Sequence, residues 1–235
     1  MKHLKLTLLS VATLAFSFLQ AQTLDEIITK HVDAIGGAEA WRKVTSIRQE
    51  GAMQVQGADV KVVRTVLNGK GSRQDIAVAG MNGYNIITPT AGWNYLPFQG
   101  QTQPEPLTEE DVKEGQPELD AQDELVDYKE KGTSVELVGK DDVDGTECFK
   151  LLVTFKSGKT ESLFIDPKSY HIIRTISKQK ANGQESDVTT NMSNYQKLPE
   201  GIVVAMSISL PFGELNVTKV EINVAVDEAI FKPSK

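Results

Sequence analysis

Few residues of this 235-residue chain are suited to catalysis or metal binding. Beyond residue 21 it has two histidines, His31 and His171, and one cysteine, Cys148. No HExxH or CxxC spacing joins them, so the sequence predicts neither a metal site nor a redox centre. Cys148 begins an apolar run and is expected to be a buried small hydrophobic residue. The two histidines are expected to be surface or capping residues.

Two short motifs resemble ligand-binding loops but lack residues that such loops need. Residues 157–160, Ser-Gly-Lys-Thr, match the end of a phosphate-binding loop, but Val153 stands where its first glycine should be. Residues 142–145, Asp-Val-Asp-Gly, resemble part of a calcium loop, but Lys140 and Leu151 replace two of its carboxylates. Both motifs are therefore predicted to be hairpin turns.

Acidic residues are abundant, yet their arrangement does not indicate a catalytic pair. The runs 109–111 and 120–124 are most simply solvated helix faces, and the sequence has no GxSxG nucleophile elbow. We therefore predict a protein that is not an enzyme and has no cofactor. An acidic pair inside a cavity is the alternative that would make it one.

The first 21 residues have the pattern of a secretory signal peptide. Lys2 and Lys5 precede an apolar stretch from Leu6 to Leu19, and Ala21 provides a small residue for cleavage. The stretch is too short and interrupted for a membrane span, and no cysteine for a lipid anchor lies near it. Residues 1–21 hold two lysines and no acids, so their removal changes the net charge from −7 to −9. An exported, periplasmic and acidic protein that does not bind nucleic acid is expected.

The mature chain, residues 22–235, should form one domain that opens with an amphipathic helix. Thr23 and Glu26 have the spacing of a capping box, and Gly36-Gly37 can end the helix. A short second helical turn is expected over 38–44, around Trp41. The apolar side chains fall on one face of the first helix: Leu24, Ile27, Ile28, Val32 and Ile35.

From residue 45 onward the pattern predicts an antiparallel meander of about ten strands. Turn dipeptides of the Asn-Gly type separate β-rich runs, at positions 68, 82, 144, 157, 182 and 200. One polar, proline-containing segment, 99–132, interrupts the meander. We expect two short inserted helices there, the first capped by Thr108 and the second over about 117–131. Several strands are apolar on both faces, so the helices are expected to cover one face of the sheet.

The most distinctive segment is an aromatic hairpin at residues 86–98. Trp93 and Tyr95 share one face of its second strand, and Leu96, Pro97 and Phe98 follow directly. Large rings of this kind can line a wide apolar cavity while offering hydrogen-bonding edges. They can equally form an ordinary aromatic core, and the residues alone do not decide between the two.

Three motifs in order give the chain a resemblance to a known family. The run Gly92-Trp93-Asn94-Tyr95-Leu96-Pro97-Phe98, the Asp166-Pro167 pair before the 170–178 strand, and the closing 227–233 segment resemble motifs of the LolA-like periplasmic lipoprotein carriers. The resemblance implies an incomplete antiparallel β-barrel, mainly β, with an N-terminal helix and inserted lid helices covering its concave apolar face. That family commonly has an arginine that holds the lid shut, and the matching stretch here, 68–73, lacks it.

By this resemblance the protein is expected to be a periplasmic carrier that shelters lipoprotein acyl chains on their way to the outer membrane. Its partners would be inner- and outer-membrane transfer proteins, and a monomer is expected. The alternative is a module that binds or senses another amphiphile on the same scaffold. The apolar cavity is expected to be lined by residues of the hairpin and of the first helix: Trp93, Tyr95, Leu96, Phe98, Ile27, Ile28, Val32 and Ile35.

Overall fold

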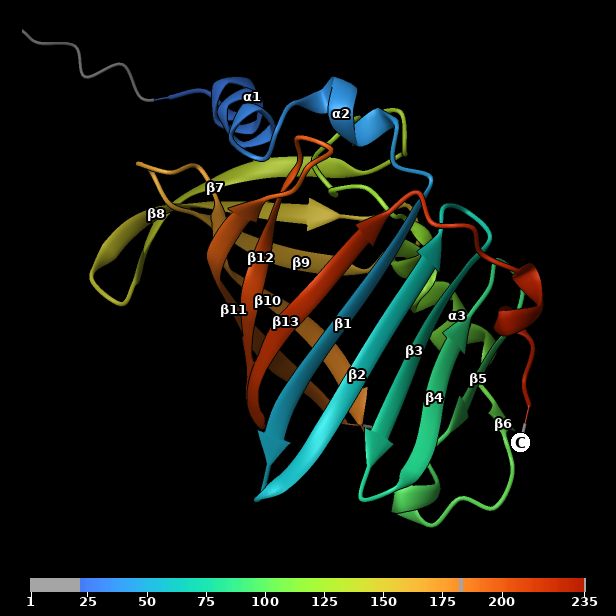
Figure 1. Cartoon of the computed structure of the whole chain (residues 1–235). Coiled ribbons are helices and arrows are strands. Elements are labelled where there is room, and N and C mark those ends of the chain that lie inside the picture. Colours follow the sequence, from blue (N-terminus) through green and yellow to red (C-terminus); the bar gives the residue numbers. More distant parts are fainter. Residues whose placement is uncertain (1–21, 182–183, 235) are drawn as a thin grey trace, which may run out of the picture.

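The computed structural model describes residues 22–181 and 184–234 (Figure 1). The predicted signal peptide, residues 1–21, and the predicted Asn182-Gly183 turn lie outside the described residues. In the described part of the chain, no helix is long and apolar enough to cross a membrane.

The first helix forms where its capping box predicts. In α1 (Leu24–Ala34) the Glu26 amide donates to Thr23 Oγ1, and the Thr23 amide donates to the Glu26 carboxylate. The helix ends before Gly36, whose φ of 109° suits glycine. A Cβ at Gly36 would also clash with the backbone of Gly201, so this glycine lets the helix end pack on the loop before β12. A second helix, α2 (Ala38–Arg42), follows directly.

The strands form one antiparallel sheet that is not closed. Its order is β6-β5-β4-β3-β2-β1-β13-β12-β11-β10-β9-β8-β7, so β6 and β7 are the two edges. The sheet curves into an incomplete barrel, with α1 and α2 above one end and α3 behind β2 to β4 (Figure 1). The strands are β1 (Ser46–Val55), β2 (Ala58–Leu67), β3 (Gly71–Val78), β4 (Met81–Ile87), β5 (Gly92–Tyr95), β6 (Glu105–Pro106), β7 (Ser134–Val143), β8 (Thr146–Thr154), β9 (Thr160–Ile165), β10 (Ile172–Ala181), β11 (Gln184–Lys197), β12 (Val203–Leu210) and β13 (Gly213–Ile222).

The predicted fold class, an open antiparallel barrel with covering helices, is confirmed. One predicted turn is wrong. Asn82-Gly83 lies inside β4, and the β3–β4 turn is formed instead by Ala79 and Gly80, both at positive φ. Glycine at position 83 has a different purpose, because a Cβ there would clash with the carbonyl of Tyr95 and the ring of Phe98.

The inserted segment contains one α-helix and a 3-10 turn in place of two α-helices. The first, α3 (Glu109–Glu114), begins at Thr108 with a capping box to Asp111, as expected for its start. The second helix was expected over about 117–131, but only η2 (Gln116–Leu119) forms. Residues 120–123 are irregular and residues 124–132 form turns. The Asp120 and Asp123 side chains accept hydrogen bonds from backbone amides two residues on. Such local bonds compete with helix formation.

The C-terminal segment covers part of the outer face of the sheet, opposite α3. It contains η3 (Glu228–Phe231), and the Phe231 ring lies directly on Gly71 of β3. The Tyr84 hydroxyl both donates to the Ser234 carbonyl and accepts from the Ser234 amide. Phe231, Tyr84 and Ile86 form a buried cluster, against which Trp93 and Tyr95 pack. The short η1 (Pro97–Gln99) follows β5.

Candidate binding cavity

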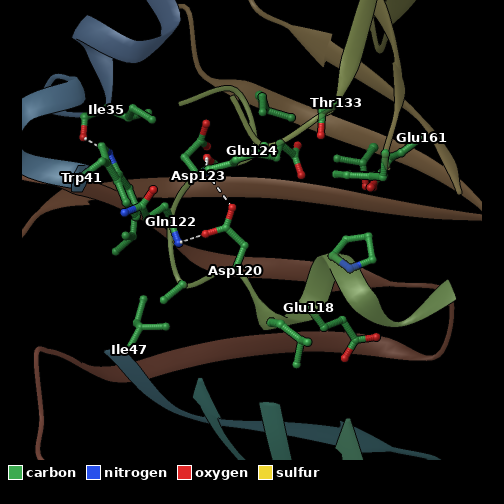
Figure 2. A pocket seen from close by; sticks show the side chains of 18 of the residues that line it. Ile35, Trp41, Ile47, Glu118, Asp120, Gln122, Asp123, Glu124, Thr133 and Glu161 are labelled. Carbon is green, nitrogen blue, oxygen red and sulfur yellow. Dashed lines mark hydrogen bonds and ion pairs between the residues drawn. The ribbon is translucent and has the colours of Figure 1, made fainter. Parts of the chain in front are cut away.

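A cavity of about 860 Å³ lies on the concave face of the sheet. Its walls come from the end of α1, from α2, from the 116–124 part of the insert and from strands β1, β2 and β9 to β12 (Figure 2). Ligand pockets commonly enclose about 300–1,000 Å³, so the cavity has the size of a binding site. Apolar residues form much of the lining, among them Ile35, Trp41, Ile47, Ile172, Met192 and Ile208.

The strand register decides which residues face the cavity. Gln49 of β1 is directly opposite Arg64 of β2, and both line the cavity. Continuing the row, Arg64 pairs with Gln74, Gln74 with Asn85 and Asn85 with Asn94. Because cross-strand partners share a face of an antiparallel sheet, this row of polar residues lies on the concave face.

Arg64 is the basic residue of this row and has few partners. Its Nη2 donates to the Glu118 carbonyl of the insert at 3.4 Å. Burial lowers the pKa of the guanidinium, and the nearby Glu118 and Asp120 carboxylates oppose that shift without forming an ion pair with it. A guanidinium stays charged in proteins in any case, so the cavity contains a permanent positive charge.

Two arginines lie in or beside the stretch 68–73, where the resemblance implies that a lid-holding arginine is missing. Arg64, outside the 68–73 stretch, contacts the insert through the Glu118 carbonyl. Arg73 lies on the outer face, where it bonds to Asp75 and to the Ile230 carbonyl of the C-terminal segment. Arg64, unlike Arg73, therefore contacts the insert.

His31 connects α1 to the insert beneath the helix and is buried in the last turn of α1, whereas the sequence predicted a surface or capping residue. The ring is 1% exposed; Nδ1 donates to the Tyr170 carbonyl at 2.7 Å, and Nε2 lies 3.4 Å from the Asp123 carboxylate. Burial favours the neutral ring, but Asp123 outweighs it and raises the pKa of His31. Burial likewise opposes ionisation of Asp123, but His31 and Lys131 help to lower its pKa. The two residues form a charged pair.

A second acidic group in the cavity, Glu124, has no positively charged partner of this kind within the residues that the structure describes. Glu124 of the insert points toward the side of the cavity where Thr133 and Glu161 lie (Figure 2). Burial and the charges of Glu161 and Asp123 raise the pKa of Glu124 well above its ordinary value. Among the described residues no group of three His, Cys, Asp or Glu side chains could hold a metal ion. The cavity therefore contains an acidic side next to its apolar centre.

Cys148 lies outside the cavity. It is completely buried, as expected, and burial raises the pKa of its thiol to about 11. A thiol with this pKa is a poor nucleophile at neutral pH.

The structure separates the eight residues predicted to line one cavity. Ile35 is in its lining, and Ile27, Ile28 and Val32 pack into the core beneath α1. Trp93 and Tyr95 lie on the opposite face of the sheet, because their cross-strand partners are Ile86 and Tyr84 of the outer cluster. Trp93 also borders a smaller groove beside α3, Leu96 precedes η1 and Phe98 lies over Gly83.

Several cavity residues were missed, although a signal for them exists in the sequence. Arg64 stands between Val62 and Val66 in the alternation of β2, at a position where an apolar residue is expected. His31 stands one helical turn from both Ile27 and Ile35, on the apolar face of α1. A polar residue that interrupts an apolar face is the feature that would have identified both.

Comparison of the fold with solved structures places it among known architectures. A LolA superfamily protein from Nitrosomonas europaea superposes with a TM-score of 0.54 at 13% identity, over 87% of this chain and 96% of that chain. The chain has a LolA-like fold. An outer membrane lipoprotein-sorting protein domain from Vibrio parahaemolyticus gives a TM-score of 0.52 at 15% identity, over 88% and 94% of the two chains.

A third similar structure belongs to a family without a functional name. The DUF1329 family protein from Desulfovibrio piger gives a TM-score of 0.52 at 14% identity, over 87% of this chain and 97% of that chain. The sequence matches no family profile and no curated protein. The LolA-like likeness is therefore one of fold.

Proposed function

We propose that this protein is a non-enzymatic periplasmic carrier that binds the acyl chains of lipoproteins and conveys them toward the outer membrane. The observation that supports it best is the cavity of about 860 Å³ on the concave face of a LolA-like sheet. Each CH₂ group removed from water contributes about 0.8 kcal/mol, so the apolar part of the lining suits acyl chains. Transfer proteins in the two membranes would deliver and receive the cargo, and the carrier would act as a monomer.

The cover over the cavity is suited to repeated opening. The 116–119 part of the insert is held to β2 and the β2–β3 turn by the Arg64 to Glu118 contact and by a backbone bond from Gly69 to Leu119. Both bonds can be replaced by water when this part of the cover moves. Leu119 is buried, so opening also exposes an apolar side chain, which bound acyl chains can cover instead. Cargo that replaces the cover's own contacts is bound with moderate affinity, which a carrier needs for release.

The test is whether acyl chains occupy this cavity. The mature protein, purified from the periplasm, should show bound lipid by native mass spectrometry, and it should bind a fluorescent fatty acyl probe on titration. Ile208→Trp fills the cavity and should weaken probe binding at least about tenfold. Ser209→Trp, the next residue of β12, introduces the same ring on the other face and should leave binding unchanged.

The result that would overturn the proposal is a protein without bound lipid that also fails to bind the probe. Equal binding by wild type and Ile208→Trp would place the acyl site elsewhere. Trp93→Ala then separates the two locations, because it weakens probe binding only if the aromatic hairpin holds the chains.

A module that binds another amphiphile is the second candidate. The mixed lining favours it, because Gln49, Arg64, Thr175 and Thr190 line the cavity together with the apolar residues. A ligand with one polar end and one apolar end matches such a lining better than acyl chains alone. Lipid extraction distinguishes the candidates by the molecule released.

A further inference from the structure

Arg64 is exceptional among the arginines of this protein. Four of the five arginines are ion-paired with a carboxylate: Arg42 with Asp127, Arg48 with Glu50 and Glu221, Arg73 with Asp75 and Arg174 with Asp144. All of these belong to the described residues, and so does Arg64, which has no such pair. In a chain with 32 acidic residues, an unpaired arginine inside a cavity needs an explanation.

The donors of Arg64 are largely unused. A guanidinium has five N–H donors, and here one of them makes a single bond of 3.4 Å to the Glu118 carbonyl. The nearest acids do not neutralise it: Glu118 is exposed, and the Asp120 carboxylate is 2.6 Å from Lys131 Nζ. The protein therefore leaves most of the guanidinium N–H groups of Arg64 free at the cavity wall.

The neighbours of Arg64 add further free donors. Gln49, which lines the cavity, and Gln74, which lies just beyond its lining, flank it in the cross-strand row. Within the described part of the chain, neither amide side chain forms a hydrogen bond with another residue. Three adjacent side chains on three strands thus offer N–H groups from one face of the sheet, which is an arrangement that binds oxygen atoms.

An apolar surface begins next to this polar row. Ile47 lies two residues from Gln49 on β1, with its side chain on the same face, and it also lines the cavity. Across the cavity, Met192 of β11 and Ile208 of β12 are direct cross-strand partners, and both belong to the lining. A ligand with its charged end on Arg64 would therefore lay its apolar part against these three residues.

We infer that the cavity binds an anionic amphiphile whose carboxylate or phosphate head group is held by Arg64, flanked by Gln49 and Gln74, and whose chain lies on Ile47, Met192 and Ile208. This inference rests on the proposed function and specifies its ligand, because it requires a charged head group as well as an acyl chain. Bidentate binding by arginine suits both head groups.

The experiment compares two probes with the same chain: a fluorescent long-chain fatty acid and its methyl ester, titrated into the full mature protein. Wild type should bind the acid about tenfold more tightly than the ester, since hydrogen bonds to charged groups contribute on that scale. Arg64→Gln should remove the preference by weakening acid binding and leaving ester binding unchanged. Arg64→Lys, which keeps the charge but not the planar guanidinium, should retain part of the preference for the acid.

A matched control is Arg48→Gln. Arg48 precedes Gln49 on β1 with its side chain on the other face, where it pairs with Glu50 and Glu221, so both affinities should stay at wild-type values. Acetate and inorganic phosphate provide a further control. If millimolar concentrations of either displace the acid probe completely, the site binds small free anions. The inference that it binds an amphiphile is then overturned.

The outcomes also separate this inference from the proposed function. Equal wild-type affinity for acid and ester overturns the head-group site and leaves an acyl carrier intact. If Arg64→Gln weakens both probes equally, Arg64 only holds the insert in place, and the inference is again overturned. If neither probe binds the wild type, the proposed function itself fails.

Discussion

Arg64 and Arg73 lie in neighbouring rows on opposite faces of the sheet, and their surroundings differ sharply. Arg73 on the outer face bonds to Asp75 and to the Ile230 carbonyl, and its guanidinium lies 4.4 Å from the centre of the Tyr84 ring. Arg64 on the concave face has one hydrogen bond, of 3.4 Å. The same residue type is satisfied by the chain on one face and left available on the other.

The difference extends to whole regions. On the outer face the C-terminal segment completes a packed cluster, in which Phe231 rests on Gly71 and Tyr84 binds the Ser234 backbone. On the concave face α1 and the insert leave a cavity of about 860 Å³. The packed outer region therefore stabilises this fold, and unpaired polar groups mark the region suited to a ligand.

The largest expected effect comes from breaking the outer cluster. Phe231→Ala removes a ring that is 4% exposed, and we expect a loss of about 3 kcal/mol in the free energy of unfolding. Urea denaturation measures the loss. Phe212→Ala, at a phenylalanine that is 59% exposed, is the control and should change stability by less than about 0.5 kcal/mol.

The same variant tests whether the two faces are independent. Acyl-probe affinity of folded Phe231→Ala should equal that of wild type, because the ring lies on the face away from the cavity. A large loss of affinity in protein that is still folded would show that the faces are coupled and would contradict the comparison.

A smaller effect is expected at the His31–Asp123 pair, which joins α1 to the insert. Asp123→Asn leaves the buried His31 without its counter-charge and should cost about 2 kcal/mol near pH 6. Because the folded-state pKa of His31 is raised above 6.5, its contribution is complete below pH 6.5 and is lost as pH rises through the folded-state pKa. Because the pKa of Asp123 is lowered in the folded state, its contribution to stability is complete above about pH 3.8.

The stability difference between wild type and Asp123→Asn should therefore be largest between about pH 4 and 6.5 and should shrink at higher pH. Urea unfolding from pH 5 to 9 measures it. Asp33→Asn, at an exposed aspartate of α1, is the control and should show a difference near zero at every pH. A difference for Asp123→Asn that grows with pH would contradict the charged pair.

Much of the architecture could be predicted because it depends on local chemistry. The Thr23 capping box and Gly36 define α1, and alternating apolar residues with turn pairs define most strands. Predictions from local sequence failed where the same residue type can serve two structural roles. Gly83 permits a close approach inside a strand rather than a turn, and the aspartates of 120–132 cap turns rather than continue a helix.

The candidate site was harder to predict than the fold. Alternation shows that Trp93 and Tyr95 share a face, but it does not say which face is concave, because sheet curvature is a property of the whole sheet. The concave side is fixed by where α1 and the insert pack, and these contacts join residues far apart in the sequence. Arg64 and His31 could have been noticed as interruptions of apolar faces, but not as neighbours of one cavity.

Glu124 gives the smallest expected effect and the one with the opposite sign. Its folded-state pKa is raised well above 4.5 by burial and by Glu161 and Asp123, so its stabilising contribution is complete below about pH 4.5 and is lost as pH rises through the folded-state pKa. Glu124→Gln mimics the protonated form. It should match wild type at pH 4.5 and be more stable than wild type at pH 8 by about 1 kcal/mol, the usual scale of a single substitution.

The exposed Glu130 provides the control, and Glu130→Gln should change stability little at either pH. A gain from Glu124→Gln that is equal at both pH values would mean that packing rather than charge is relieved. A gain in stability that grows with pH would show that the cavity contains electrostatic repulsion at neutral pH. On the outer face, by contrast, the Phe231→Ala truncation is expected only to destabilise the protein. Such repulsion is expected where a fold keeps polar groups for a ligand instead of pairing them with each other.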